Sequence, residues 1–206
     1  MTTTLNASTV NGFVTTADTS GNLALQGNGT TVATAQPTGF TINSYAPSAS
    51  LITQGTAIAS TSGTAISFTG IPSWVKRITV MFRGTSTSGT SPYIVQIGSG
   101  SYTTSGYLGS GLTTGNLNTL SSSLYTAGFA VLNTVTAASI FHGIITIVNQ
   151  TGNSWVAAAT GSYSDGAGCT SGSGSITLSG VLDRVQVTTV NGTDTFDAGS
   201  INILYE

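Results

Sequence analysis

The chain has 206 residues and a net charge of −2, and 5% of its residues are charged, against about 25% in a typical globular domain. Apolar residues make up 39%, which is enough for a packed core and excludes a disordered chain. Four cations exclude a basic surface for nucleic acid, and the longest apolar run, near residues 140–148, is too short for membrane insertion.

The residue types favour strands and turns. The chain contains 38 threonines, 28 serines and 27 glycines. Threonine suits a pleated surface, whereas serine and glycine suit turns, so an all-β protein is expected. The first residues lack the basic and apolar regions of a secretory signal peptide, which predicts synthesis in a cytoplasm. A single cysteine, Cys169, excludes an internal disulfide and a multi-cysteine metal site.

Residues 1–45 predict a small β-rich module. Asn-Gly pairs at Asn11 and Asn28 are typical of tight hairpin turns. Large apolar side chains are too few here to form a core alone, so the module needs other copies or a larger surface. We therefore expect an attachment or oligomerisation module. Residues 46–62, with Pro47 among small polar residues, predict a connector.

Residues 63–206 predict an antiparallel β-sandwich, jelly-roll-like in its strand spacing. Residues 125–140 fit a short helix as an alternative. The sequence ISFTGI at 66–71 is echoed by ITLSGV at 176–181, which predicts two equivalent strand–turn–strand corners, one in each sheet. The expected strands are 64–69, 75–83, 92–98, 124–132, 139–149, 154–163, 174–179, 184–190 and 200–206.

Three of the four cations lie in the stretch FTGIPSWVKRITVMFRG, residues 68–84. Strand alternation places Ile78, Val80 and Phe82 on a core face. Arg77 and Arg83 fall on the opposite face, where they either serve as outward-facing solubilising charges or pair with carboxylates of the same chain or of another subunit. Four acidic residues are available as partners: Asp183, Asp194, Asp197 and Glu206.

Oxygen ligands gather in NGTDTFDAG, where Asn191, Asp194 and Asp197 are closely spaced, with Asp165 in a second Gly-rich turn. Calcium takes about six to eight oxygens, more than these side chains supply, so Asx turns are the favoured interpretation. No metal and no cofactor is expected.

His142 is the only histidine and lies in an apolar strand pattern. Alternation places it with Ile140, Ile144 and Thr146, opposite Phe141 and Ile145. Hydrolysis would need a nucleophile and a carboxylate beside it, and the sequence has no nucleophile elbow. A structural histidine and a non-enzymatic protein are therefore expected.

Tyr102, Tyr107 and Tyr125 lie in or beside a Gly/Ser-rich stretch, residues 98–125, read as loops. Exposed aromatic rings on loops can stack on sugars, which makes these tyrosines candidates for glycan or partner contact. Packing of the loop on itself is the alternative.

Three segments resemble recurring parts of virion proteins of tailed bacteriophages. The opening TTLNASTVNGFVTTADTSGNLALQGNG…VATAQPTGF resembles the N-terminal module of tail-fibre and head-fibre proteins. FTGIPSWVKRITVMFRG and LDRVQVTTVNGTDTFDAGSINILYE are similar to segments of phage structural proteins.

This resemblance implies a short fibre or capsid-decoration protein in the virion. Residues 1–45 would bind capsid or tail proteins, residues 63–206 would face outward, and the assembly would be a homotrimer. Receptor or host-glycan binding during adsorption is the alternative function.

Overall fold

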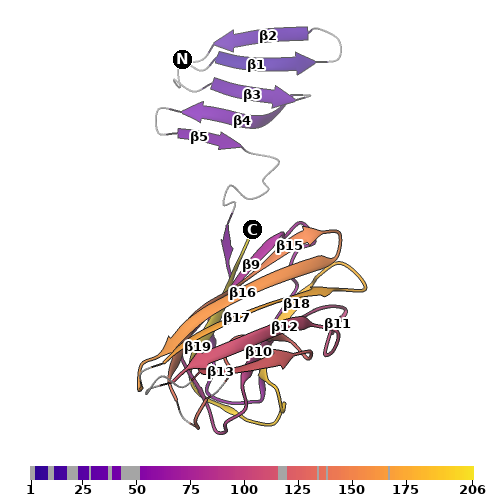
Figure 1. The fold of residues 1–206 in the computed structure, drawn as a ribbon. Coiled ribbons are helices and arrows are strands. Elements are labelled where there is room, and N and C mark those ends of the chain that lie inside the picture. The colour runs from indigo at the N-terminus through magenta and orange to yellow at the C-terminus, as the bar shows by residue number, and fades with distance from the viewer. Residues whose placement is uncertain are drawn as a thin grey trace. The chain divides into compact units, whose positions relative to one another are not determined.

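The structure of the protein is a computed structural model that describes residues 3–8, 12–17, 23–27, 29–36, 39–42, 52–115, 120–133, 135–137, 139–166 and 168–206. The chain divides into two compact units, Met1–Leu51 and Ile52–Glu206. Every regular element among these residues is a β-strand, so the all-β class is confirmed (Figure 1). The described part of 125–140 contains no helix.

The first unit is one five-stranded sheet in the order β2-β1-β3-β4-β5. β1 and β3 are parallel, and the other neighbours are antiparallel. Among the side chains described here, Ala33 and Thr34 are buried, whereas Leu23 and Leu25 are half-buried. The buried positions among them therefore hold small side chains. Its strands are β1 (Thr3–Ser8), β2 (Gly12–Ala17), β3 (Leu23–Gly27), β4 (Thr30–Gln36) and β5 (Gly39–Ile42).

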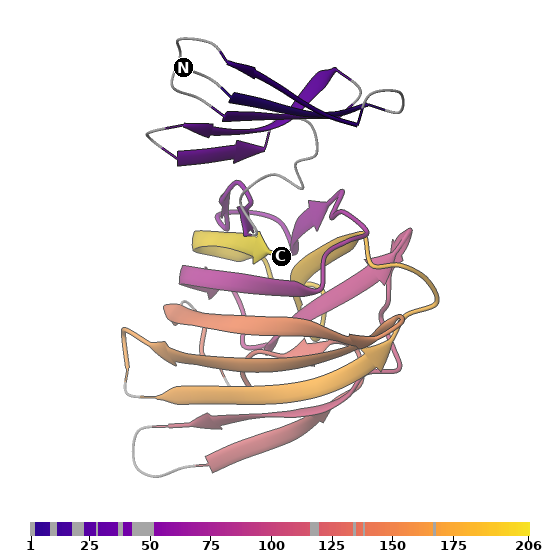
Figure 2. The same cartoon turned by 90° about the horizontal axis from the view of Figure 1, so that it is seen from above.

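The second unit is the expected antiparallel β-sandwich. Its larger sheet has nine strands in the order β13-β12-β17-β16-β15-β9-β19-β6, with β7 also paired to β19 (Figure 2). Its smaller sheet has five strands in the order β11-β10-β18-β8, with β14 also paired to β10. The neighbours in both sheets are antiparallel.

The strands of the larger sheet are β6 (Thr53–Gln54), β7 (Ile58–Ala59), β9 (Arg77–Thr87), β12 (Leu108–Thr114), β13 (Leu120–Tyr125), β15 (Phe141–Thr151), β16 (Ser154–Tyr163), β17 (Cys169–Thr177) and β19 (Phe196–Tyr205). Those of the smaller sheet are β8 (Ala65–Thr69), β10 (Tyr93–Ser99), β11 (Ser101–Tyr102), β14 (Phe129–Ala130) and β18 (Arg184–Thr189).

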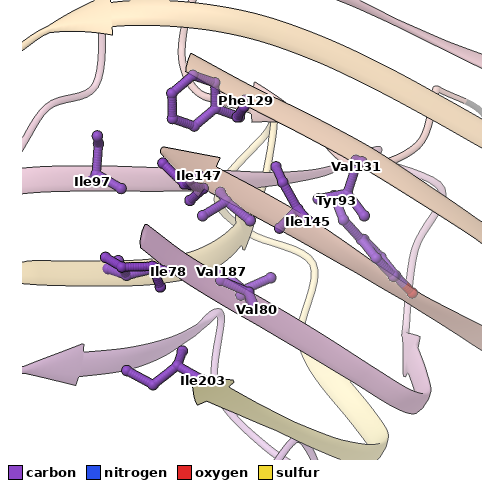
Figure 3. Close-up of a cluster of buried hydrophobic side chains, with 14 of the residues drawn as sticks. Ile78, Val80, Tyr93, Ile97, Phe129, Val131, Ile145, Ile147, Val187 and Ile203 are labelled. Carbon is purple, nitrogen blue, oxygen red and sulfur yellow. The ribbon is translucent and has the colours of Figure 1, made fainter. Parts of the chain in front are cut away.

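The core fills the space between the two sheets (Figure 3). Ile78, Val80 and Phe82 of β9 are buried, which confirms the core face expected from alternation. Tyr93 of the smaller sheet bridges the layers, since its ring lies 6.0 Å from that of Phe141 in the larger sheet, nearly perpendicular to it. Such edge-to-face pairs add to the stability gained from apolar burial.

Part of the expected connector belongs to the sandwich. β6 and β7 both pair with β19, at Leu204–Gln54 and Ile201–Ile58 respectively. Residues 43–51 lie outside the described residues. The second unit therefore begins within the segment 46–62 that the sequence assigns to a connector.

The echoed segments form corners that join the two sheets, which corrects the expectation of one corner within each sheet. Residues 66–71 lead from β8 in the smaller sheet to β9 in the larger one, and residues 176–181 lead from β17 in the larger sheet to β18 in the smaller one. The two segments differ in the burial of their last residue, because Ile71 is buried and Val181 is 55% exposed.

The prediction that residues 98–125 form loops is wrong. β11, β12 and β13 all lie in this segment, and β12 lies between β13 and β17 in the larger sheet. The expected strand 124–132 divides into the end of β13 and the two-residue β14, on different sheets.

Candidate functional site

The basic residues at the start of β9 lie on the outer face of the larger sheet. Arg77 forms an ion pair with Glu206, one of the four partners that the sequence offers. Lys76 Nζ lies 3.5 Å from Asn149 Oδ1. Arg83 is exposed and makes no ion pair with any described residue. Arg77 is thus paired within the chain, and a subunit contact through Arg83 stays a prediction.

Asp183 and Arg184 form the second ion pair, at the start of β18. Arg184 Nε donates to Asp183 Oδ1 over 2.8 Å, and Arg184 Nη2 donates to Asp183 Oδ2 over 3.0 Å. The Gly100 N–H donates to the same carboxylate. The hydrogen bond from Arg184 holds the pKa of the Asp183 carboxyl below its ordinary value. This carboxylate therefore fixes the corner between β10 and β11.

Asp194 and Asn191 build a turn. Asn191 Oδ1 accepts hydrogen bonds from the N–H groups of Thr193 and Asp194, as in an Asx turn. The Asp194 carboxylate accepts from the Ser91 N–H and from the Asn191 amide. The described residues contain no group of three or more metal-ligating side chains.

The other two candidate carboxylates are engaged elsewhere. Asp197 accepts a hydrogen bond from Ser86 Oγ. Asp165 lies in a separate turn and accepts from the Ile140 N–H over 3.0 Å. With Asp183, Asp194 and Glu206, every acidic side chain of residues 52–206 has a bonding partner within the chain.

His142 lies on the exposed face of β15, as alternation predicts. Its Nδ1 accepts a hydrogen bond from the Gly84 N–H over 3.3 Å, and its Nε2 lies 3.2 Å from Ser164 Oγ. Because Nδ1 accepts, we assign the ring proton to Nε2, which then donates to Ser164. A general base would have to accept the serine proton at that nitrogen. In this arrangement His142 instead cross-links three backbone segments.

Tyr107 and Tyr125 are buried in this fold, whereas Tyr102 is half-buried. Tyr107 is 1% exposed, and its hydroxyl accepts from the Ile97 N–H over 2.9 Å. Tyr125 is 6% exposed, and its hydroxyl contacts Asn133 Oδ1 over 2.9 Å. The ring of Tyr102 lies 5.7 Å below the Arg184 guanidinium.

Their burial corrects the expectation of glycan contact through Tyr107 and Tyr125, because the strands of 98–125 direct these rings into the protein. Burial also raises the pKa of Tyr107 and of Tyr125 to about 12.

One cavity, with a volume of about 280 Å³, has titratable residues in its wall. Its lining residues include Thr113, Ser121, Tyr163 and Asp165. Burial raises the pKa of Tyr163 above its ordinary value. A second cavity of about 380 Å³ is lined by Trp155, Gln150 and several hydroxyls, with no charged group. Neither wall carries an acid–base pair in contact.

The edge of the larger sheet carries the most exposed large apolar side chains of the described residues. Leu124 is 85% exposed, Leu108 72% and Leu120 69%. They lie on two neighbouring strands, β12 and β13. We call Leu108, Leu112, Leu120 and Leu124 the edge patch. The sequence signal is the spacing of leucines among small residues in LGSGLTTG, residues 108–115, and the glycines, which are typical of turns, obscure it.

No helix of the described residues is long and apolar enough to cross a membrane. No protein-family model matches the chain, and no curated protein matches it. Among solved structures, it is similar to the crystal structure of a protein of unknown function from Shewanella oneidensis MR-1. That match has 12% sequence identity and a TM-score of 0.25, and it covers 76% of this chain and 75% of that chain. A similarity at this level carries no argument about function.

Proposed function

We propose that this chain is a non-enzymatic structural protein of a tailed-phage virion, in which the first unit attaches to capsid or tail and the sandwich is displayed. The observation that carries the proposal is that the acidic side chains of the second unit bond within the chain. The acidic side chains of residues 52–206 bond to groups of the same chain, in turns, corners and ion pairs. Polar groups used in this way support a rigid scaffold.

The division into two units supports the same proposal. The described side chains of the first unit bury small groups such as Ala33 and Thr34. A unit as small as Met1–Leu51 buries a modest share of its surface on folding, so it gains stability when it packs on another surface. The resemblance of its sequence to virion attachment modules agrees with that need.

The test changes the first unit within the full chain. Ala33 is 6% exposed on β4, so Ala33→Asp buries a charge and disrupts the unit. Thr30→Asp, at an exposed position of the same strand, is the matched control. Quantitative mass spectrometry of purified particles should find the control at the wild-type copy number and Ala33→Asp at a strongly reduced one. Equal incorporation of both variants would overturn the proposal.

A further inference from the structure

β13 forms an unprotected edge of the nine-stranded sheet. It pairs with β12 on one side, and no described strand pairs with its other side (Figure 2). Natural edge strands are blunted by charges, prolines, bulges or short length. β13 has six residues, LSSSLY, and its register with β12 shows no bulge. At the opposite edge β6 is two residues long, and β8 of the smaller sheet exposes no large apolar side chain.

The sequence of this edge is a palindrome. Residues 120–124 read Leu-Ser-Ser-Ser-Leu, with Ser122 at the centre. If two copies of β13 pair antiparallel around a two-fold axis at Ser122, Leu120 of each copy lies opposite Leu124 of the other. Residues opposite each other in an antiparallel pair point to the same face, so the match holds on both faces of the sheet.

The edge patch lies on the outer face of this strand pair. Leu120 and Leu124 are opposite Thr114 and Ser110 of β12, and Leu112 lies between those two positions on the same face. Pairing of two copies therefore brings two edge patches into one continuous apolar surface. Contact across the axis covers the leucines that a single copy leaves in water.

We propose that β13 is an interaction surface for a second copy of this chain, joined by antiparallel β13–β13 pairing centred on Ser122. The two sheets then continue into one another. The strand carries no charge, so an uncharged partner strand can pair with it. Because residues 120–124 are a palindrome, each position of one copy lies opposite the same residue type in the other copy. A closed two-fold contact uses the same patch on both copies and ends the sheet extension at two.

The experiment measures the mass of the full chain by sedimentation equilibrium. Leu120→Glu together with Leu124→Glu places like charges opposite each other in the pair, so the mass should fall to half that of the wild type. Leu120→Lys with Leu124→Lys should do the same. An equimolar mixture of the diglutamate and dilysine variants should regain the wild-type mass, because every introduced glutamate then faces a lysine.

The matched control is Ile144→Glu with Val156→Glu. These side chains are 43% and 41% exposed on β15 and β16, away from the edge. This variant should keep the wild-type mass. Regain of mass in the mixture also shows that both edge variants are folded. The proposal is overturned if the edge variants leave the wild-type mass unchanged or reduce it to one third. It is also overturned if the mixture stays at half mass, or if the control variant halves the mass.

Discussion

Arg77 and Glu206 contact each other through both side chain and backbone. Their side chains form an ion pair. The Arg77 N–H donates to Glu206 O over 2.8 Å, and the Glu206 N–H donates to Arg77 O over 2.9 Å. The β9–β19 pairing, which runs to Ile78–Tyr205, is thereby extended by one residue pair. Arg77, one of the three clustered cations, therefore stabilises the end of the β9–β19 strand pair.

We expect this ion pair to add little stability by itself. The Arg77 side chain is 48% exposed and that of Glu206 26%, and exposed pairs contribute about 0.2–1 kcal/mol. A double-mutant cycle of Arg77→Gln and Glu206→Gln, measured by urea unfolding, should give a coupling energy in that range that shrinks in about 1 M salt. A coupling above about 3 kcal/mol, as for a buried pair, would contradict this assignment.

The hydroxyls of Tyr107 and Tyr102 should differ in their effect on stability. Tyr107→Phe leaves the buried Ile97 N–H without a partner and should lower the free energy of unfolding by about 1–3 kcal/mol. The Tyr102 hydroxyl is buried with no hydrogen-bond partner, so Tyr102→Phe should be neutral or stabilising. Urea unfolding of both variants checks this, and an equal loss in the two would contradict the structure.

Gly161 should not tolerate a side chain. It pairs with Gly143 across β15 and β16, and a Cβ on Gly161 would overlap the buried ring of Phe141. Gly161→Ala should therefore destabilise the protein by about 1–3 kcal/mol. Gly166→Ala is the control, because a Cβ there meets nothing within 4 Å. Thermal unfolding should show a lower midpoint for Gly161→Ala and an unchanged midpoint for Gly166→Ala. A lower midpoint for Gly166→Ala alone would refute the close contact between Gly161 and Phe141.

Alkaline pH should unfold the protein as its buried tyrosines ionise. Burial raises the pKa of Tyr93, Tyr107 and Tyr125 from 10.0 to about 12. These groups favour the folded state fully below pH 10.0, and their contribution is lost as the pH rises from there towards about 12, since the unfolded chain releases those protons first.

Tyrosinate absorbance and circular dichroism should follow this loss together. Tyr125→Phe removes one such group, so stability should fall less steeply with pH in this variant than in the wild type. Full tyrosine ionisation with unchanged circular dichroism would contradict the burial.

The alternation of apolar and polar residues predicts much of the sandwich. β16 begins and ends where the sequence places it, at Ser154 and Tyr163, and the core face of β9 is as expected. The failure at β12 has a physical cause. A Cβ on Gly109 would overlap Ser173 O, and one on Gly111 would lie 2.7 Å from the Ala130 Cβ. These glycines permit close packing within a strand, whereas in sequence they resemble turn residues.

The candidate site was less predictable, because its contacts depend on which strands are neighbours. The sequence offers four carboxylates to Arg77, and the β9–β19 pairing selects Glu206. Likewise, residues 98–125 predict exposed tyrosines as long as they are read as loops. Once β12 lies inside the sheet, Tyr107 at its start turns into the core.

The position of β9 has a consequence for synthesis. β9 lies between β15 and β19, and both neighbours come much later in the chain. During synthesis, β9 therefore has no sheet partner until β15 is made, and it lacks its second partner until β19 is made. Pairing between such distant segments makes folding slow, and a waiting apolar strand is prone to aggregate. The sandwich is therefore completed only once β19 has been synthesised, and until then one edge of β9 has no partner strand.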